Sequence, residues 1–222
     1  MTIEPTPTRH PIADQMYSVL LHQFMSGERG PGEPLNIGAL SRELDVSQTP
    51  LREALARLEH TGLVQREALR GYRVAPMMTR EEIDQLREAR MLLEPRLARD
   101  AATRVTDDFR AALDLTLQEF DRAAQDADTA SEGFNLYWRS DDRFHTLIAE
   151  QSGNAFLAMS YRALSGQIQR FRLFSKFGHT GARHAAPEHR AIFDAIVAGE
   201  PERAAQAMTA HIRGATDRLL GT

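Results

Sequence analysis

The sequence predicts a mainly helical protein with two parts, a small head that ends in a β-hairpin and a larger all-helical body. Its 222 residues exceed what one average domain needs and suit two small ones. Short helical patterns followed by two short strand patterns fill residues 11–75. From residue 79 to residue 220, apolar residues recur at helical spacing with only short breaks. The apolar fraction of 42% is ordinary for a globular chain, so wholesale disorder is excluded.

The composition excludes several classes of protein. Without cysteine, the chain has no disulfide framework, no thiolate zinc site and no cysteine nucleophile. No apolar stretch approaches the length of a membrane span, and the first residues lack the apolar region of a signal peptide. We therefore expect a soluble cytoplasmic protein with no membrane contact. The net charge of −4 also argues at first sight against nucleic acid, because domains that bind it are usually basic.

The head is expected to begin after a mobile tail at residues 1–10, which lack apolar periodicity. A first helix starts at Ile12, and the glycines and prolines of residues 26–34 stop it. Together with the elements that follow, it makes up a head domain at residues 11–75.

A second pair of helices follows in the head. Asn36 suits the N-cap of a short helix, and Ser47 suits the N-cap of the next one. Between them, Asp45-Val46 makes a turn. Residues 63–66 and 72–75 are then predicted as the strands of a hairpin with an arginine-bearing tip.

Two helices joined by a short turn and followed by a hairpin make a winged helix-turn-helix. The second helix of this motif enters the major groove, where its first residues reach base edges and phosphates. Glutamine there can pair bidentately with adenine, arginine with guanine or phosphate, and hydroxyls suit phosphate oxygens. The candidate DNA-binding residues are Ser47, Gln48, Thr49 and Arg52 on this helix, with Arg70, Gly71 and Arg73 on the wing.

The stretch from Leu40 to Val64, LSRELDVSQTPLREALARLEHTGLV, resembles the DNA-binding signature of the GntR family of bacterial transcription regulators. The wing sequence RGYRV, which ends at Val74, fits the same pattern. The resemblance implies DNA contacts from the helix and wing residues named above. Many members of the family have arginine at the position of Gln48, and some have one at the position of Gly38. We therefore expect fewer guanine contacts here, or a different operator sequence.

The body, residues 79–222, follows a linker at 76–78 and is predicted to contain six helices. Thr79 and Glu82 form the pattern of a capping box at its start. The glycine-rich segment before residue 183 is expected to be a connection. The predicted helices lie at roughly 79–103, 106–126, 131–152, 154–177, 183–199 and 201–220.

Four side chains in the body form a candidate metal site. Asp141 and His145 stand four residues apart on a predicted helix, so they share one face. His189 and His211 lie on the fifth and sixth predicted helices of the body. One carboxylate and three imidazoles suit a divalent ion such as Zn²⁺, Ni²⁺ or Mn²⁺. Spacing alone is weak evidence, because a buried histidine is more often a hydrogen-bonded core residue.

The body also resembles a known effector domain, the FCD domain of the FadR-type branch of the GntR family. Six helices rather than seven resemble its VanR-like subgroup. The matching pieces are Asp141-x-x-Phe-His145, SGNAFL at 152–157, Glu188-His189-x-x-Ile192 and Met208-x-x-His211. The resemblance implies that Asp141, His145, His189 and His211 hold a metal, and it selects Asp141 over Asp142. It also implies that a small organic acid completes the coordination shell.

The resemblance implies a ligand-responsive regulator, most commonly a repressor that its ligand releases from DNA. Arg90, on the first helix of the body, can pair with the carboxylate of such an effector. An ion pair with Glu94, four residues further on, is an equal alternative. One small head covers only one half-site, so a homodimer on a palindromic operator is expected.

A metal-dependent enzyme acting on a small carboxylate is the alternative function. Such an enzyme needs a general base beside the metal-bound water. Apart from Asp142 and Glu188, no further acid stands out near the histidine motifs, and the head has no role in this hypothesis. We therefore expect a regulator and no enzyme.

The distribution of charge removes the objection to DNA. Residues 47–73, the recognition helix and wing, contain five arginines and three acids, a net charge of +2. The whole-chain charge of −4 thus conceals a locally basic surface. We expect modest nonspecific DNA affinity, with dimerisation needed for tight operator binding.

Overall fold

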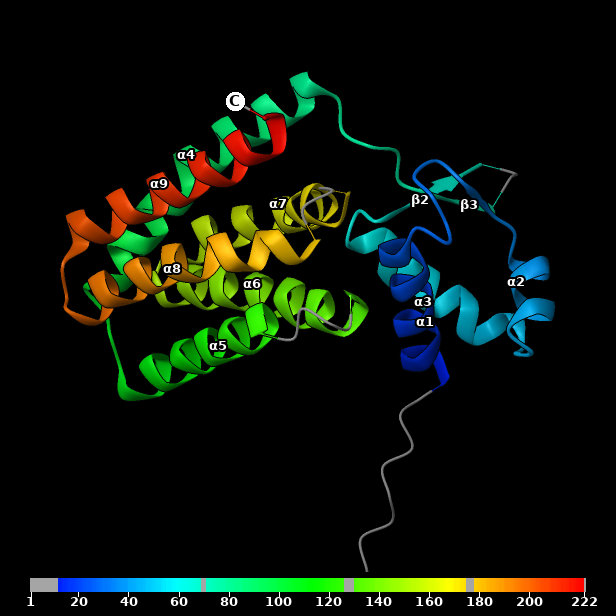
Figure 1. The fold of residues 1–222 in the computed structure, drawn as a ribbon, viewed down its shortest axis with the longest axis horizontal. Coiled ribbons are helices and arrows are strands. Elements are labelled where there is room, and N and C mark those ends of the chain that lie inside the picture. The colour runs from blue at the N-terminus through cyan, green and yellow to red at the C-terminus, as the bar shows by residue number, and fades with distance from the viewer. Residues whose placement is uncertain (1–11, 69–70, 126–129, 175–177, 222) are drawn as a thin grey trace, which may run out of the picture. The chain divides into compact units, whose positions relative to one another are not determined.

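The computed structural model describes residues 12–68, 71–125, 130–174 and 178–221 (Figure 1). The prediction of a mainly helical protein is confirmed. The chain divides into two compact units, residues 1–76 and 77–222. The predicted tail at residues 1–10 and the wing residue Arg70 lie outside the described residues.

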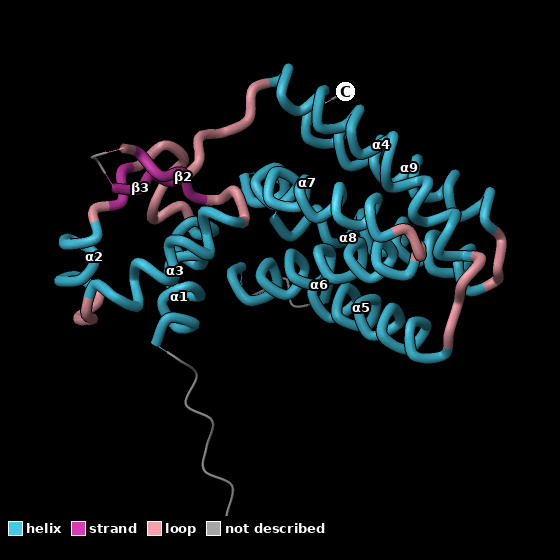
Figure 2. Tube along the Cα trace, turned by 180° about the vertical axis from the view of Figure 1, so that it is seen from behind, coloured by secondary structure: helices cyan, strands magenta, loops and turns pink. Residues whose placement is uncertain are grey.

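The first unit is a winged helix-turn-helix (Figure 2). Its three short strands pair antiparallel in the order β1-β3-β2. The strand β1 was not predicted, because two residues are too few to show an alternating pattern. The elements are α1 (Ile12–Ser26), β1 (Pro34–Leu35), α2 (Ile37–Glu43), α3 (Gln48–His60), β2 (Val64–Glu67) and β3 (Gly71–Val74).

Local polar contacts fix the start of α2 and the turn between α2 and α3. Asn36 caps α2, because its side-chain oxygen accepts a hydrogen bond from the backbone N–H of Ala39 at 2.9 Å. Asp45 adopts the left-handed region with φ 49°, which short polar residues tolerate in turns. The Ser41 hydroxyl donates to the carbonyl of Val46 at 2.6 Å and closes the turn. The turn thereby fixes where α3 begins.

The second unit contains six helices in its described part, as the sequence predicts. The helices α4 and α9 lie side by side, and so do α5 and α6 (Figures 1 and 2). The predicted capping box is present, since Glu82 accepts from the N–H of Thr79 at 2.7 Å and Thr79 accepts from that of Glu82 at 3.1 Å. The helices are α4 (Arg80–Ala102), α5 (Asp107–Gln125), α6 (Ala130–Gln151), α7 (Ala155–Phe174), α8 (Gly178–Val197) and α9 (Pro201–Leu220).

The start of α8 differs from the prediction. The sequence places it near residue 183, but the helix begins at Gly178 and includes part of the glycine-rich segment. Glycine lowers helix propensity by about 1 kcal/mol relative to alanine but does not forbid a helix, so composition alone is a poor guide to this boundary.

The core of the second unit combines apolar side chains with a buried polar group. Phe120, Phe144, Leu113 and Tyr161 are almost fully buried in its apolar cluster. Charged and imidazole side chains from four helices are buried among them, which proteins rarely allow unless the groups are paired. This buried polar group is where the sequence predicts the metal site. Within the described ranges, no helix is long and apolar enough to cross a membrane.

Candidate metal centre and nucleic-acid interface

The four predicted metal ligands come together inside the body. Asp141 and His145 from α6, His189 from α8 and His211 from α9 each offer one ligand atom, and these atoms lie within 4.8 Å of one another. The Nε2 atom of His189 lies 3.2 Å from Oδ1 of Asp141 and 3.4 Å from Nε2 of His145. None of the four residues is more than 3% exposed. Residues separated by up to 70 positions in the sequence thus form one compact, buried cluster.

Each histidine ring is held by an acceptor on the side away from the cluster. Nδ1 of His189 forms a hydrogen bond with the carbonyl of Ala185 at 2.7 Å, and Nδ1 of His211 forms one with Glu188 Oε2 at 2.9 Å. Nδ1 of His145 lies 2.8 Å from Glu94 Oε2 in an ion-pair contact. A carboxylate or carbonyl only accepts, so each Nδ1 carries the proton when its ring is neutral. The Nε2 atoms then present their lone pairs to the cluster, which is the form that binds a metal.

Two arginines hold the carboxylates that orient the histidines. Arg90 donates to Glu94 from Nε at 2.5 Å and from Nη2 at 3.3 Å, and both side chains are buried. Arg218 donates to Glu188 from Nη1 at 2.6 Å and from Nη2 at 3.0 Å. Such two-point pairs are stronger than single ones and neutralise the charge that burial would otherwise oppose.

The surroundings of Glu94, Glu188 and His211 shift the pKa values of these groups toward the protonation states that a metal site needs. Burial works to raise the pKa of Glu94, but Arg90 and His145 lower it well below its usual range. Burial likewise opposes the charge on Glu188, yet His211 and Arg218 lower its pKa to about 2. Burial and the neighbouring His189 lower the pKa of His211 to about 3. At neutral pH the two glutamates are therefore ionised and His211 is neutral.

Asp142 and Arg90 are not among the four clustered ligand candidates. Asp142, the competitor of Asp141, accepts a hydrogen bond from Nε2 of Gln169 on α7 and is not part of the cluster. Arg90 makes the ion pair with Glu94 that was the alternative to an effector contact. Its contact with an effector therefore stays a prediction.

The first turn of α3 displays the predicted reading residues. Ser47, Gln48, Thr49 and Arg52 are all exposed. Ser47 has extended backbone geometry at the N-cap, and its hydroxyl makes no capping hydrogen bond to the described helix. Nη2 of Arg52 donates to Oε1 of Gln48 at 3.3 Å, so these two side chains lie on one face. Hydroxyls at a helix N-terminus, beside a glutamine and an arginine, suit phosphates and base edges.

The wing differs from what the sequence suggests for Arg73. Its Nε and Nη2 atoms donate to the carboxylate of Glu67 at 2.7 and 3.3 Å, and Nη1 donates to the carbonyl of Gly32. The side chain thus joins β2, β3 and the loop before β1. Gly71 has φ 93°, a region that favours glycine, at the start of β3. A DNA contact from Arg73 stays a prediction and competes with this ion pair.

Sequence reasoning missed several residues that build the two sites. Arg218 lies seven residues after His211, two helical turns further along the same face of α9, and this spacing could have indicated it. Glu67 and the carbonyl of Ala185 carry no comparable signal, because tertiary pairing and main-chain geometry bring them into place.

Comparison with known proteins now identifies the class. Residues 12–74 match the family described as bacterial regulatory proteins, gntR family, and residues 85–214 match the FCD domain. The chain belongs to the GntR family of bacterial transcription regulators and carries an FCD domain. It is therefore a transcription regulator with a DNA-binding GntR domain and an FCD effector domain.

Individual relatives agree with this class. The chain is 31% identical over 191 residues to the Nta operon transcriptional regulator of Aminobacter aminovorans, covering 86% of each chain. It is 28% identical over 219 residues to the HTH-type transcriptional repressor RspR of Escherichia coli strain K12, covering 96% of this chain and 91% of the other. The solved structure of E. coli McbR/YncC shares the fold with a TM-score of 0.71 at 20% identity, covering 96% of this chain and 99% of that one.

These relatives and both matched families are regulators of transcription rather than enzymes. The expectation that the chain is not an enzyme is therefore confirmed.

Proposed function

We propose that this regulator is a repressor whose operator affinity is controlled by a divalent metal ion and a small carboxylate effector bound in its body. In this proposal, residues 11–75 bind DNA, residues 76–78 link the parts, and residues 79–222 bind the effector and dimerise. A relative that is itself named a repressor supports the direction of control.

One observation carries the metal proposal. The Nδ1 atoms of His145 and His189 both face groups that only accept hydrogen bonds. In their neutral forms, these rings point two Nε2 lone pairs at each other across 3.4 Å, beside the carboxylate of Asp141. Facing lone pairs repel each other in a dry interior, and a cation between them turns that repulsion into coordination. A hydrogen-bonded core would instead need a proton on Nε2 of His189, shared with Asp141 at 3.2 Å or His145 at 3.4 Å.

The four candidate ligand atoms are of the chemical types that bind divalent metal ions. Asp141 supplies one oxygen, and His145, His189 and His211 supply three nitrogens, which suits Zn²⁺, Ni²⁺ or Mn²⁺. The ion would supply positive charge and open coordination positions to an anionic ligand. The chain's own residues orient the rings, exclude water and hold the orienting carboxylates ionised.

A small organic acid suits this site as effector. Its carboxylate would complete the coordination shell, and Arg90 would provide a second cationic contact through Nη1, since its other two guanidinium nitrogens hold Glu94. Control of DNA binding requires that effector and operator favour different states, with a coupling of typically about 1–3 kcal/mol.

For operator binding we propose a homodimer on a palindromic site in cytoplasmic double-stranded DNA. Gln48 and Arg52 would read base edges, while Ser47 and Thr49 would hold phosphates. Arg70, Gly71 and Arg73 would place the wing along the backbone. Two heads in one dimer match the two-fold symmetry of a palindrome.

The test begins with the metal content of the purified protein. Elemental analysis should find about one divalent ion per chain, as expected for one four-ligand site. Adding Zn²⁺ to chelator-treated protein should raise its melting temperature, and His189→Ala should abolish that rise. Absence of any metal, together with an unchanged melting temperature on metal addition, would contradict the proposal.

Two further experiments test the DNA and the effector. Selection of bound DNA from a genomic library should return a palindromic operator, and the neighbouring genes would indicate the effector's chemistry. A panel of small carboxylates should then weaken operator binding by the metal-loaded protein. Equal operator affinity with every acid in the panel would contradict an acid effector.

A further inference from the structure

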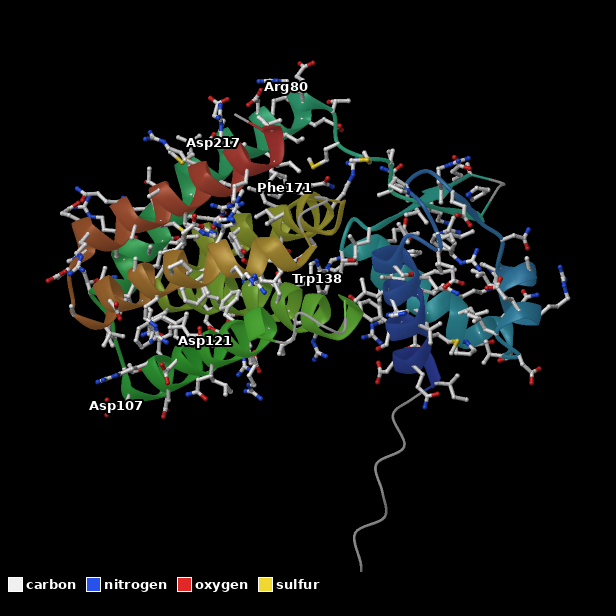
Figure 3. The ribbon with its side chains drawn as sticks, viewed as in Figure 1. Arg80, Asp107, Asp121, Trp138, Phe171 and Asp217 are labelled. Atoms are coloured by element: carbon white, nitrogen blue, oxygen red, sulfur yellow. The ribbon has the colours of Figure 1, made fainter. Side chains whose placement is uncertain are left out.

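A chain of three side chains leads from the last turn of α9 to the candidate metal centre. Arg218 donates to Glu188 at 2.6 and 3.0 Å, and Glu188 Oε2 lies 2.9 Å from Nδ1 of His211. Arg218 lies beside Asp217, at the end of the body where α4 begins at Arg80 (Figure 3). Its side chain is 25% exposed, whereas that of His211 is 3% exposed. The chain therefore connects a partly exposed arginine with a buried ligand candidate.

Gly214 makes room for this chain. It lies three residues after His211 and four before Arg218, on the same face of α9. A Cβ atom at Gly214 would come within 2.9 Å of Oε1 of Glu188 and 3.0 Å of Nη1 of Arg218. Glycine is among the poorest helix formers, so it weakens α9 locally. Its missing side chain lets Glu188 reach both partners.

The structure builds a similar chain on the other side of the site, from Arg90 through Glu94 to His145. The two differ in burial, because Arg90 and Glu94 are at most 3% exposed. Removing one partner of a fully buried pair destabilises the whole fold. The partly exposed pair of Arg218 and Glu188 can be altered with much less damage, so its effect on the metal can be measured.

We propose that Arg218, Glu188 and Gly214 position His211 as a metal ligand and thereby set the affinity of the site for its ion from the end of α9. Arg218 and Glu188 act through the imidazole, and Gly214 supplies the space. This inference rests on the proposed metal-binding function, because it concerns the same site.

The physical effect has two parts. A carboxylate that accepts from Nδ1–H fixes both the tautomer and the orientation of the ring, so that the Nε2 lone pair faces the ion. It also makes the ring a more basic ligand. Arg218 holds this carboxylate in place with two hydrogen bonds. Loss of such an outer partner typically weakens metal binding by about 10–100-fold.

Two variants and one control test the proposal. Arg218→Gln removes the guanidinium that pairs with Glu188. Gly214→Ala displaces Glu188 but leaves every charged residue of the chain in place. The control is Arg213→Gln on the same helix, an exposed arginine outside the chain of contacts described above. Zn²⁺ affinity is measured by competition with a chromophoric chelator. We expect affinities about 10–100-fold weaker in both variants and an unchanged affinity in the control.

A second readout separates positioning from a general loss of structure. In the metal-free protein, Gly214→Ala should keep a cooperative thermal transition, because the gain in helix propensity offsets part of the loss caused by displacing Glu188. Imidazole nitrogen NMR shifts of metal-free wild type should report the Nδ1–H tautomer at His211, and both variants should show a mixture. A purely structural role would lower the melting temperature and leave the tautomer unchanged.

The outcomes distinguish the two proposals. If wild type binds Zn²⁺ and both variants bind it as tightly as wild type does, the positioning role is wrong, but the proposed metal-binding function stands. If wild type itself fails to bind a divalent ion, both are overturned. Weaker binding in both variants with an unchanged control supports the positioning role.

Discussion

The DNA-reading surface of the head and the metal centre of the body use polar residues in opposite ways. Ser47, Gln48, Thr49 and Arg52 are exposed, and the contact between Gln48 and Arg52 is long. In the body, Glu94 and the clustered histidines His145, His189 and His211 are buried, and Nδ1 of each of these three rings lies beside an acceptor. An exposed surface keeps its hydrogen-bonding groups for a partner, whereas a buried polar group needs a partner inside the protein, either another side chain or a bound ion. Substitutions should therefore act on binding in the head and on both folding and binding in the body.

The largest expected effect is on folding, from Glu94→Ala. This change leaves Arg90 buried without its partner and releases the ring of His145. Breaking a buried pair typically costs about 3–5 kcal/mol of unfolding free energy. Urea denaturation followed by circular dichroism measures it. The exposed pair of Arg203 and Glu200 provides the control, because Glu200→Ala should cost less than about 1 kcal/mol. Equal stability of Glu94→Ala and wild type would remove the distinction between the buried and the exposed region.

The next effect is a pH dependence of the metal-free body. His211 has a pKa of about 3 in the native protein and one near 6.5 when unfolded, so the unfolded chain binds a proton that the native state excludes between these values. The free energy of unfolding therefore falls as the pH falls through this window, by at most about 1.4 kcal/mol per pH unit. Glu188, whose pKa drops from 4.5 to about 2, adds a loss in the same direction below pH 4.5.

Denaturation in chelator at pH 7, 6 and 5 measures the contribution of His211. The free energy of unfolding should change less with pH in His211→Gln than in wild type. In His184→Gln it should change as steeply as in wild type, because His184 is exposed on α8. A profile that is equally steep in the His211 variant would show that burial of this imidazole does not control stability.

In the head, Arg52→Ala should weaken operator binding by about 1–3 kcal/mol if the side chain makes a bidentate base contact. The melting temperature should stay unchanged, since Arg52 is exposed and its contact with Gln48 is long. Fluorescence anisotropy with the selected operator measures the affinity, and Arg110→Ala on α5 is an exposed control from the body. A variant that binds as wild type does would refute the base-reading role.

The smallest expected effect is a change in operator affinity caused by a substitution in the wing. Whether the affinity rises or falls indicates the role of Arg73. If Arg73 mainly holds the strands through Glu67, then Glu67→Gln loosens the wing and lowers operator affinity severalfold. If Arg73 mainly contacts phosphate, the same change frees its charge and raises the affinity. Operator titrations at two salt concentrations distinguish the cases, because a freed phosphate contact also steepens the salt dependence. An increase in affinity would place Arg73 with the exposed reading residues of α3.

Much of both regions could be predicted from the sequence. The spacing of Asp141 and His145 follows from helix geometry, and the GntR and FCD resemblances placed His189 and His211 beside them. The caps at Asn36 and Thr79 rest on local hydrogen bonds, which depend on neighbouring residues alone.

The rest depends on distant contacts that the sequence does not display. Glu94 was considered only as a partner for Arg90, yet it also orients His145 from another helix. Glu188 was weighed as a catalytic base, but it is held between His211 and Arg218. Such roles arise from packing between helices, and periodicity within one helix does not reveal them.

The most direct test is a calorimetric titration of chelator-treated protein with Zn²⁺. We predict one ion bound per chain by wild type and loss of that binding in His145→Ala, His189→Ala and His211→Ala, each of which removes one ligand. Wild type that binds no ion, or three variants that bind as wild type does, would contradict a metal centre in the body.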